Sequence, residues 1–313
     1  MRRLTVVATL VAAGLSLAAT GSATTTTTTT ARTSSGPKPI CVGAGATRHC
    51  SRWAARDTWA GRPVYTAQFV PDPATPAVRV YAAWLRSSAV DLALYPGYKG
   101  PDPNLTLPRG PEMVPLNARP RLLATFNSGF YEYDSAAGFY TNHLLYHPMI
   151  RGLATVVRYS NGKLDVLAWT GGPTPAPNVV MARQNLNLLV GGGRPTARAA
   201  DDSLWGVTLG GVPAVWRTAL GVTAQGDLVY AAAPEQTSAT LARIMVDLHC
   251  VRAMQLDINP AWPIFVTYAR PGAVGPTLIV PNPNQIPGRF LYSSTKDFFA
   301  VFVSRHPGEA QPW

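Results

Sequence analysis

An acid, an amide and an aromatic ring lie close together in the chain at Asp257, Asn259 and Trp262. Residues 251–257 alternate apolar and polar side chains, which predicts a β-strand that ends at the carboxylate. The apolar neighbours of Asp257 would partly desolvate the carboxylate, as is typical of a general acid or base. A carboxylate at a strand end beside an amide and an indole suits a polar ligand. The other interpretation is a structural acid that caps the following turn.

A second polar element follows the apolar run of residues 122–126, which predicts a buried strand. Asn127 offers both a donor and an acceptor, and Gly129 permits backbone geometry that is closed to other residues. Aromatic side chains are dense here, namely Phe130, Tyr131, Tyr133, Phe139 and Tyr140. They could form a platform on which a sugar stacks, or they could line the core, because Tyr and Phe carry large contact areas. Both interpretations stay open.

The elements that must position these residues are short. Two apolar runs, 216–223 and 228–231, flank a Gly-containing link and predict a β-hairpin. Residues 237–249 carry apolar side chains at helical spacing, with Thr237 or Ser238 as N-cap. Asn161-Gly162 predicts a further hairpin, and other strand-like runs are residues 78–85, 90–94, 290–292 and 298–303. The predicted fold class is α+β, a single globular domain with mixed or antiparallel sheets and few short helices.

Several of these segments together resemble the phosphodiester glycosidase family, over roughly residues 78–303. The matching pieces are "ATFNSGFY" (124–131), "RGLATVVRYSNGKLDV" (151–166), "RQNLNLLV" (183–190), "RTALGVTAQGDLVY" (217–230), "ATLARIMVDL" (239–248) and "AMQLD" (253–257). Many members follow the strand acid with Gly-Gly-Gly-Ser, whereas this chain reads Asp257-Ile258-Asn259-Pro260. The resemblance implies an enzyme that removes a sugar from a sugar-phosphate diester.

Glycosidic hydrolysis usually needs two carboxyl groups. Asp257 is the first candidate, and the pair at residues 201–202 is the second. A phosphate leaves as a stable anion and needs charge stabilisation, for which Arg217 at the head of the predicted hairpin is a candidate. Thr218 and Asn127 could orient the diester or the sugar hydroxyls, and Gly129, Phe130, Tyr131, Asn259 and Trp262 complete the predicted substrate-binding set. The alternative role for Arg217 is a salt bridge to a neighbouring acid.

Two further motifs have residue types that occur in ligand sites. His143 and His147 are four residues apart, but Leu144 stands where a metalloprotease helix has Glu, which favours a role without metal. Three glycines before Arg194 could cradle a phosphate, but no helix signal follows, so a surface loop is favoured. No cofactor is predicted. A divalent metal is the alternative, which ligand spacing does not support.

The ends of the chain show its organisation. Residues 1–23 have the basic start, apolar run and small-residue end of a signal peptide, and no later span is predicted to cross a membrane. Residues 24–39 predict a disordered Thr/Ser/Pro-rich spacer. Residues 40–63 predict a small N-terminal collar, and residues 64–313 the glycosidase-like domain. The prediction is a secreted or cell-surface protein.

Three cysteines bear on this prediction. Cys41 and Cys50 close a short loop and are predicted to form a disulfide in an oxidising compartment. Cys250 follows the predicted helix and is expected to be a buried, inert thiol.

The net charge is +11, and the basic excess is nearly all Arg. Such a chain is attracted to anionic envelope polymers. The other interpretation, favoured for most of these Arg residues, is that they reflect the base composition of the source genome. Nothing in the pattern indicates nucleic-acid binding. The predicted function is a secreted hydrolase that cleaves the sugar–phosphate bond of a sugar-1-phosphate diester, on a small substrate or an envelope glycopolymer. The alternative is a non-catalytic envelope glycopolymer-binding module on the same fold.

Overall fold

The computed structural model describes residues 36–56, 63–102, 104, 106–206, 209–270 and 272–304. The chain divides into two units, residues 1–36 and 37–313, and all elements below belong to the second. The predicted signal peptide and most of the predicted spacer lie outside the described residues. Within the described ranges, no helix is long and apolar enough to cross a membrane.

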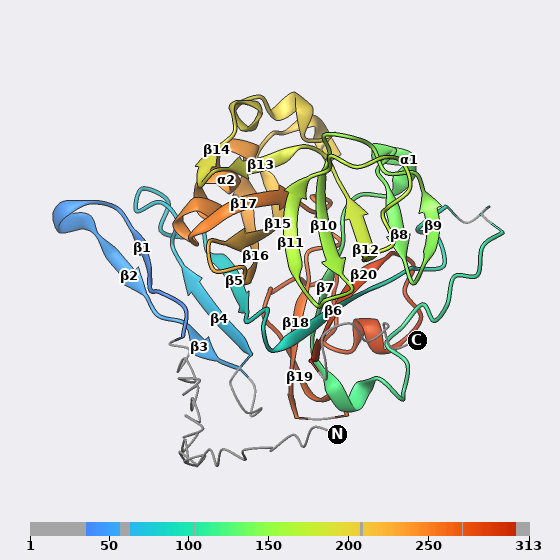
Figure 1. Cartoon of the computed structure of the whole chain (residues 1–313). Coiled ribbons are helices and arrows are strands. Elements are labelled where there is room, and N and C mark those ends of the chain that lie inside the picture. Colours follow the sequence, from blue (N-terminus) through green and yellow to red (C-terminus); the bar gives the residue numbers. More distant parts are fainter. Residues whose placement is uncertain are drawn as a thin grey trace, which may run out of the picture. The chain divides into compact units, whose positions relative to one another are not determined.

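The largest sheet has eight strands and contains the predicted hairpin (Figure 1). Its order is β14 (Arg194–Pro195), β13 (Leu188–Gly191), β17 (Cys250–Gln255), β15 (Val215–Thr223), β16 (Leu228–Gln236), β5 (Val80–Leu85), β4 (Val64–Phe69) and β3 (Ala54–Ala55). Its central strands β15, β16 and β17 all come from residues 215–255, directly before Asp257. The predicted hairpin and strand are therefore confirmed.

Two five-stranded sheets complete the frame. One has the order β19 (Val274–Leu278), β18 (Phe265–Arg270), β7 (Leu122–Asn127), β20 (Phe298–Val303) and β6 (Val90–Tyr95). The other has the order β11 (Leu164–Ala168), β10 (Ala154–Tyr159), β12 (Val179–Gln184), β8 (Phe139–Thr141) and β9 (Leu144–His147). The strand β7 runs directly into the aromatic loop. Two consecutive strands, β5 and β6, lie in different sheets, so the chain crosses between sheets at residues 86–89.

Helices are few and short. The α-helices are α1 (Glu132–Ser135) and α2 (Ser238–Asp247), and the 3-10 helices are η1 (Gly45–Thr47), η2 (Arg119–Arg121), η3 (Ala197–Ala200), η4 (Asp202–Leu204), η5 (Leu209–Gly211) and η6 (Arg289–Leu291). Every strand pairing in the described part of the chain is antiparallel. The fold is thus mostly β, with several antiparallel sheets and the few helices that were predicted. The predicted strand at residues 290–292 is wrong, because η6 occupies that segment.

The helix α2 forms for the reasons visible in the sequence. Thr237 is its N-cap in a capping box with Thr240, which satisfies backbone donors at the first turn. Leu241, Ile244 and Met245 are buried against the eight-stranded sheet, at about 1.5–3 kcal/mol each. Beneath the helix, Gly221 cannot be replaced easily, since a Cβ atom there would lie 2.7 Å from Cys250 Sγ. The helix therefore fixes the position of β17, which leads to Asp257.

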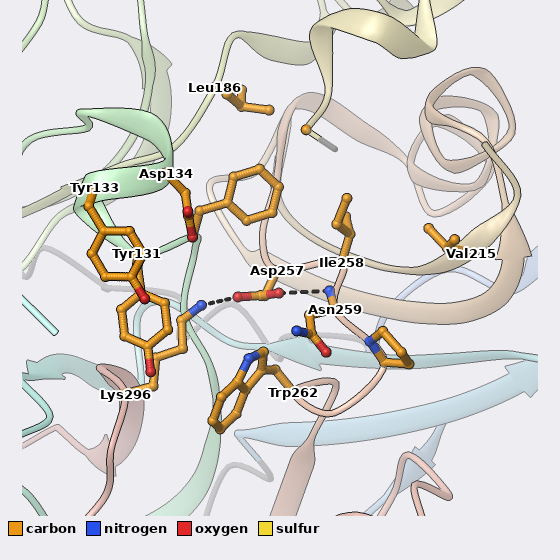
Figure 2. Close-up of a pocket in the computed structure, with 13 residues that line it drawn as sticks. Tyr131, Tyr133, Asp134, Leu186, Val215, Asp257, Ile258, Asn259, Trp262 and Lys296 are labelled. Atoms are coloured by element: carbon orange, nitrogen blue, oxygen red, sulfur yellow. Dashed lines mark hydrogen bonds and ion pairs between the residues drawn. The ribbon is translucent and has the colours of Figure 1, made fainter. Parts of the chain in front are cut away.

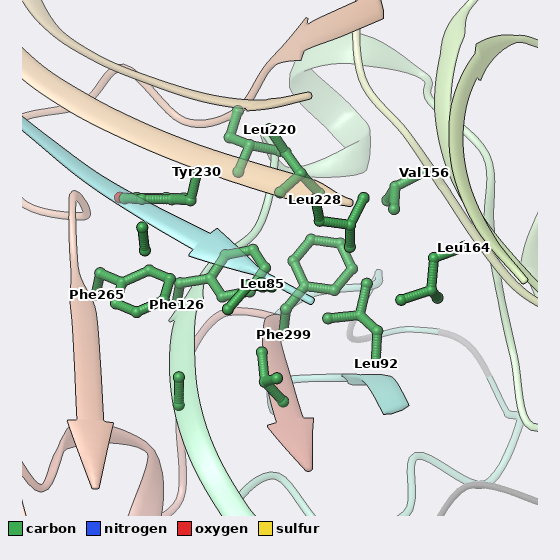
Figure 3. Packing of buried hydrophobic residues seen from close by; sticks show 14 of the residues in the cluster. Leu85, Leu92, Phe126, Val156, Leu164, Leu220, Leu228, Tyr230, Phe265 and Phe299 are labelled. Carbon is green, nitrogen blue, oxygen red and sulfur yellow. The ribbon is translucent and has the colours of Figure 1, made fainter. Parts of the chain in front are cut away.

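One apolar core is shared by the three large sheets (Figure 3). Phe126 of β7 stacks on Phe265 at 5.5 Å between ring centroids and on Phe299 at 5.1 Å. Leu220 of the eight-stranded sheet and Val156 of the third sheet belong to the same cluster. Because the ends of β7 and β17 are fixed by this common core, the loops that follow them are held close together.

The cysteine predictions are confirmed. Cys41 and Cys50 form a disulfide across the hairpin of β1 (Ile40–Val42) and β2 (His49–Ser51). Cys250 is a buried free cysteine that forms no disulfide, and burial raises the pKa of its thiol. A buried thiol of this kind stays protonated and unreactive at neutral pH.

His143 and the glycine motif lie at turns between strands, and His147 is the last residue of β9. Asn142 and His143 adopt positive φ angles of 49° and 61° in the hairpin between β8 and β9. Gly191 ends β13, and Gly192 and Gly193 form the turn to β14 with φ angles of 58° and 74°. The second motif is the surface turn that the sequence favoured.

Candidate active site

A cavity of about 450 Å³ opens where the loops after β7 and β17 meet (Figure 2). It is lined by Phe130, Tyr131, Tyr133, Asp134, Leu186, Gly206, Val215, Asp257, Ile258, Asn259, Pro260, Trp262 and Lys296. A volume of this size accommodates a small ligand such as one or two sugar units. Of the residues predicted to bind or act on substrate, the cavity brings together Asp257, Asn259, Trp262, Phe130 and Tyr131.

Asp257 is the buried acid of this cavity, with 3% of its surface exposed. Its backbone is fixed at both ends, because its N–H donates to the Ser128 carbonyl at 3.2 Å and its carbonyl accepts from Thr218 Oγ1 at 2.7 Å. Its Oδ1 accepts the Asn259 N–H at 2.8 Å, so the predicted turn cap is also present. Burial raises the pKa of Asp257, and Lys296 opposes that increase.

Lys296 is the partner of Asp257 that sequence reasoning missed. Its Nζ forms an ion pair and hydrogen bond with Asp257 Oδ2 inside the pocket. The same ammonium lies 4.5 Å from the ring centroid of Tyr131 and 5.7 Å from that of Trp262, which are cation–π distances. A carboxylate and two aromatic faces therefore hold the cation at the pocket wall. The available signal was a Lys-Asp pair directly before an apolar strand in a chain with four Lys.

Some of the aromatic residues of this loop face the cavity as a possible sugar platform, and others pack in the core. Tyr131 and Tyr133 stack with 4.9 Å between ring centroids, and Tyr133 is 72% exposed. Both line the cavity, so they can offer a face to a sugar. Phe139 and Tyr140 are instead buried in core clusters. The loop is thus part ligand-facing platform and part core.

Three predicted binding residues support the site from behind it. Asn127 donates to Thr218 Oγ1 at 3.0 Å and accepts from Tyr230 Oη at 2.8 Å, and both Asn127 and Thr218 are buried. Because Thr218 holds the carbonyl of Asp257, this network positions the acid. Gly129 lies against Asn185, since a Cβ atom there would be 3.2 Å from the Asn185 amide carbon. None of the three lines the cavity.

Arg217 uses its donors inside the fold. It is fully buried and donates to the Gln236 carbonyl at 2.8 Å, to Gln255 Oε1 at 2.7 Å and to the Pro213 carbonyl at 3.1 Å. Its Nη2 lies 3.5 Å from Asp202 Oδ1, which matches the salt-bridge alternative. Burial lowers the pKa of Arg217, and Asp202 opposes that effect. The side chain does not line the cavity.

The acids at residues 201 and 202 also have structural partners. Asp201 accepts from the N–H and hydroxyl of Ser203, at 3.1 and 2.6 Å, at the start of η4. Asp202 accepts from the N–H and hydroxyl of Ser238 at the start of α2, at 2.7 and 2.6 Å. Neither lines the cavity, whereas Asp134 does, and it is exposed. Asp134 is therefore the second carboxylate that faces the pocket.

Replacing Arg217 by methionine should lower the free energy of unfolding by about 3 kcal/mol, because it leaves buried acceptors without a donor. The kcat/KM of the folded fraction should change little, since the guanidinium lies outside the pocket. Urea unfolding followed by fluorescence, together with an active-fraction assay, measures both quantities. A large loss of kcat/KM in a stably folded variant would instead support a contact between Arg217 and the phosphate.

Behind the tyrosine wall lies a second group of charges. Arg183 of β12 is fully buried, with its Nη2 3.0 Å from Glu132 Oε1 and its Nε 2.9 Å from Asp297 Oδ2. Burial raises the pKa of Glu132 from 4.5 to about 7, with a further increase from Asp297 and a decrease from Arg183. Glu132 lies next to Tyr131 in the chain, and Asp297 lies next to Lys296.

The raised pKa of Glu132 makes the stability of the protein depend on pH. A carboxyl group whose pKa is higher in the folded state stabilises the fold at low pH, and that contribution is lost as pH rises from about 4.5 to about 7. The expected loss is about 3 kcal/mol. Thermal unfolding of the wild type and of Glu132→Gln across this range should show the variant gaining relative stability by that amount. If the unfolding stability of the two proteins changed with pH in the same way, Glu132 would not be the group with the raised pKa.

Among the described residues, no group of three His, Cys, Asp or Glu side chains is arranged to hold a metal ion. The chemistry that the described site offers from its own side chains consists of two carboxyl groups, one ammonium and an aromatic wall.

Comparison with known proteins shows a match to one protein family. The model of the phosphodiester glycosidase family matches residues 121–257, a segment that begins just before β7 and ends at Asp257. No curated protein matches the chain. Among solved structures, the chain is similar to the catalytic domain of zebrafish N-acetylglucosamine-1-phosphodiester alpha-N-acetylglucosaminidase, auto-inhibited by its pro-peptide. The TM-score is 0.51 and the identity 15%, over 82% of this chain and 88% of that one.

A hypothetical protein from Synechocystis is also similar, with a TM-score of 0.44 and 12% identity over 77% of this chain and 62% of that one. The zebrafish likeness concerns the fold, and the family match concerns the segment that carries the aromatic loop, β15, α2 and β17. The resemblance seen in the sequence is thus confirmed as a match of residues 121–257 to the model of the phosphodiester glycosidase family.

Proposed function

We propose that this protein hydrolyses the bond between the sugar and the phosphate of a sugar-1-phosphate diester. The observation that carries the proposal is the buried Asp257–Lys296 pair in a cavity walled by tyrosine and tryptophan. The family match over residues 121–257 supports the reaction class. The pair supplies one negative and one positive charge at the same place, which is what a sugar cation and a phosphate anion would need.

The sugar would lie against the aromatic wall. Tyr133 is exposed and Tyr131 and Trp262 line the same cavity, so their faces can contact the apolar face of a sugar ring. Asn259 lies beside them, and its side-chain oxygen accepts the Ala261 N–H at 3.0 Å. The amide N–H₂ group of Asn259 is the polar group on this side that can bind a sugar hydroxyl.

The reaction would break the bond between the sugar carbon and the phosphate oxygen, and the phosphate would leave with the bonding electrons. Asp257, held as a carboxylate by Lys296, stabilises the positive charge that develops on the sugar carbon. The Lys296 ammonium stabilises the departing phosphate anion. Water adds its oxygen to the sugar carbon, and Asp134 at the exposed side of the cavity can accept the released proton.

The substrate would be a small diester or an envelope glycopolymer met outside the cytoplasm. The net charge of +11 and the signal-peptide pattern of residues 1–23 support an anionic partner and export. A second candidate function is a glycopolymer-binding module without turnover. It is favoured by one observation, namely that Ile258 and Pro260 line the cavity where many family members have a glycine run.

A panel of α- and β-linked sugar-1-phosphate diesters with chromogenic leaving alcohols tests the proposal. The protein lacking residues 1–23 is assayed with and without a chelator, beside Asp257→Asn and the surface control Asp201→Asn. Turnover that is lost only with the Asp257 variant supports the proposed enzyme. Saturable, salt-sensitive binding of anionic glycopolymer without turnover of any diester would favour the binding module instead.

A further inference from the structure

Arg183 joins the two walls of the pocket from behind. Besides its ion pairs with Glu132 and Asp297, it donates to the Gln184 carbonyl at 2.7 Å and to the Phe130 carbonyl. Phe130 and Glu132 flank Tyr131 in the aromatic wall. Asp297 directly follows Lys296, the cation bound to Asp257. We call Glu132, Arg183 and Asp297 the carboxylate clamp.

The carboxylate clamp is buried and only partly satisfied. Glu132 is 2% exposed and Asp297 is 1% exposed. Both carboxylate oxygens of Glu132, and Asp297 Oδ1, have no hydrogen-bond partner within the described part of the chain, although Glu132 Oε1 is ion-paired with Arg183. An ionised carboxylate in such surroundings is costly, whereas the protonated form is not. Glu132 is thus a group whose charge the surrounding structure can readily change.

The charges that face Glu132 come from several elements. Arg183 reaches it from β12, and Lys296 and Asp297 from the segment before β20. Asp257, just after β17, interacts instead with Arg183 and the neighbouring tyrosines. The nearby phenols are Tyr131 and Tyr133, and the pKa of each is raised chiefly by burial. His147 of β9 lies close enough for Arg183 to lower its pKa, after the larger effect of burial.

These groups carry an excess of negative charge before any ligand arrives. With Glu132 ionised, three carboxylates (Glu132, Asp257 and Asp297) face two cations (Arg183 and Lys296). A phosphodiester adds one more negative charge to the same wall. Neutralising one carboxyl would offset the charge that the ligand adds, without moving the Asp257–Lys296 pair.

We propose that Glu132 is a positioning residue of the pocket that takes up a proton when an anionic substrate binds. The inference rests on the proposed function, because it requires a phosphodiester at Lys296. The proton moves from solvent to a Glu132 carboxylate oxygen, and Arg183 then remains paired with Asp297 alone. Because burial raises the pKa of Glu132 to about 7, its carboxylate can take up a proton near neutral pH when the ligand binds.

Titration calorimetry in two buffers of different ionisation enthalpy tests the inference. The probe is a C-glycosidic phosphonate monomethyl ester, which keeps one negative charge throughout the pH range tested and cannot be cleaved at the sugar carbon. The wild type should take up a sizeable fraction of a proton per ligand near pH 7. Above that pH its Kd should rise by up to about tenfold per pH unit.

Glu132→Gln should bind the same probe with little proton uptake and a nearly flat Kd above neutral pH, so that it binds more tightly than the wild type there. Glu235→Gln, an exposed acid on β16, should behave as the wild type. Thermal unfolding confirms that each variant is folded. If Glu132→Gln does not fold, His147→Gln is measured in its place: uptake that persists in that variant supports Glu132, and uptake that is lost assigns the proton to His147.

Binding of the probe without proton uptake by the wild type would overturn this inference and leave the proposed function intact. Uptake that persists in Glu132→Gln would assign the proton to another group, such as His147. Failure of the wild type to bind the probe at any pH would instead contradict the proposed function, and the inference with it.

Discussion

Replacing Asp257 by asparagine should lower kcat by about 10³-fold. Asparagine keeps the shape of the side chain and can still accept the Asn259 N–H, so the loop after β17 should stay in place. The variant loses the negative charge that stabilises the sugar cation and holds Lys296. Steady-state hydrolysis of the best diester of the panel measures the loss, and circular dichroism shows whether the fold is kept.

The control for this prediction is Asp201→Asn, because Asp201 is an exposed cap of η4 that lies outside the cavity. Its kcat should remain at the wild-type value. The double variant Asp257→Asn with Lys296→Met removes the unpaired ammonium, and should recover stability without recovering activity. Unchanged turnover in Asp257→Asn would remove Asp257 from the reaction.

Replacing Lys296 by methionine should reduce kcat/KM by about 10²- to 10³-fold for an anionic diester. Methionine retains much of the length of the side chain between Tyr131 and Trp262 but not the charge. The variant also leaves Asp257 buried without its cation, which should lower the free energy of unfolding by about 3–5 kcal/mol. Loss of Lys296 removes the interaction that opposes the burial-raised pKa of Asp257.

The pH profile of kcat/KM separates the loss of the Lys296 charge from the change in the pKa of Asp257. Because the pKa of Asp257 should rise further in Lys296→Met, the carboxylate forms only at higher pH, and the acidic limb of kcat/KM should move upward. Lys163→Met is the matched control, since the Lys163 side chain is 63% exposed and its partners, Asp165 at 3.5 Å and the Tyr159 ring at 5.9 Å, lie outside the cavity. An acidic limb at the same pH in Lys296→Met and the wild type would contradict the role given to the ion pair.

Local patterns predicted the parts of the site that are continuous in the chain. The strand that ends at Asp257, the turn residue Asn259 and the ring of Trp262 are read within a few residues of one another. The hairpin of β15 and β16, the helix α2 and the hairpin around Asn161-Gly162 follow likewise from turn residues, caps and periodicity. These signals act over one or two elements, and the elements that carry them formed where they were predicted, whereas the short apolar run at residues 290–292 did not form a strand.

The parts of the site that the sequence did not predict depend on contacts between sheets. Lys296 lies 39 residues after Asp257, and Arg183 lies 114 residues before Asp297. No local pattern connects such pairs, because the order of strands in the three sheets decides which residues meet. Arg217 shows the same limit within one strand. A buried Arg in an alternating strand can face either side, and its partners from η4 and β16 were not visible in the sequence.

Hydrolysis in oxygen-18-labelled water tests the central claim most directly. If the protein breaks the bond between the sugar carbon and the phosphate oxygen, mass spectrometry should find the label in the released sugar and none in the released phosphate monoester. Asp257→Asn should release labelled sugar about 10³-fold more slowly than the wild type. Label in the phosphate product would show attack at phosphorus, and would contradict the assignment of a sugar phosphodiester glycosidase.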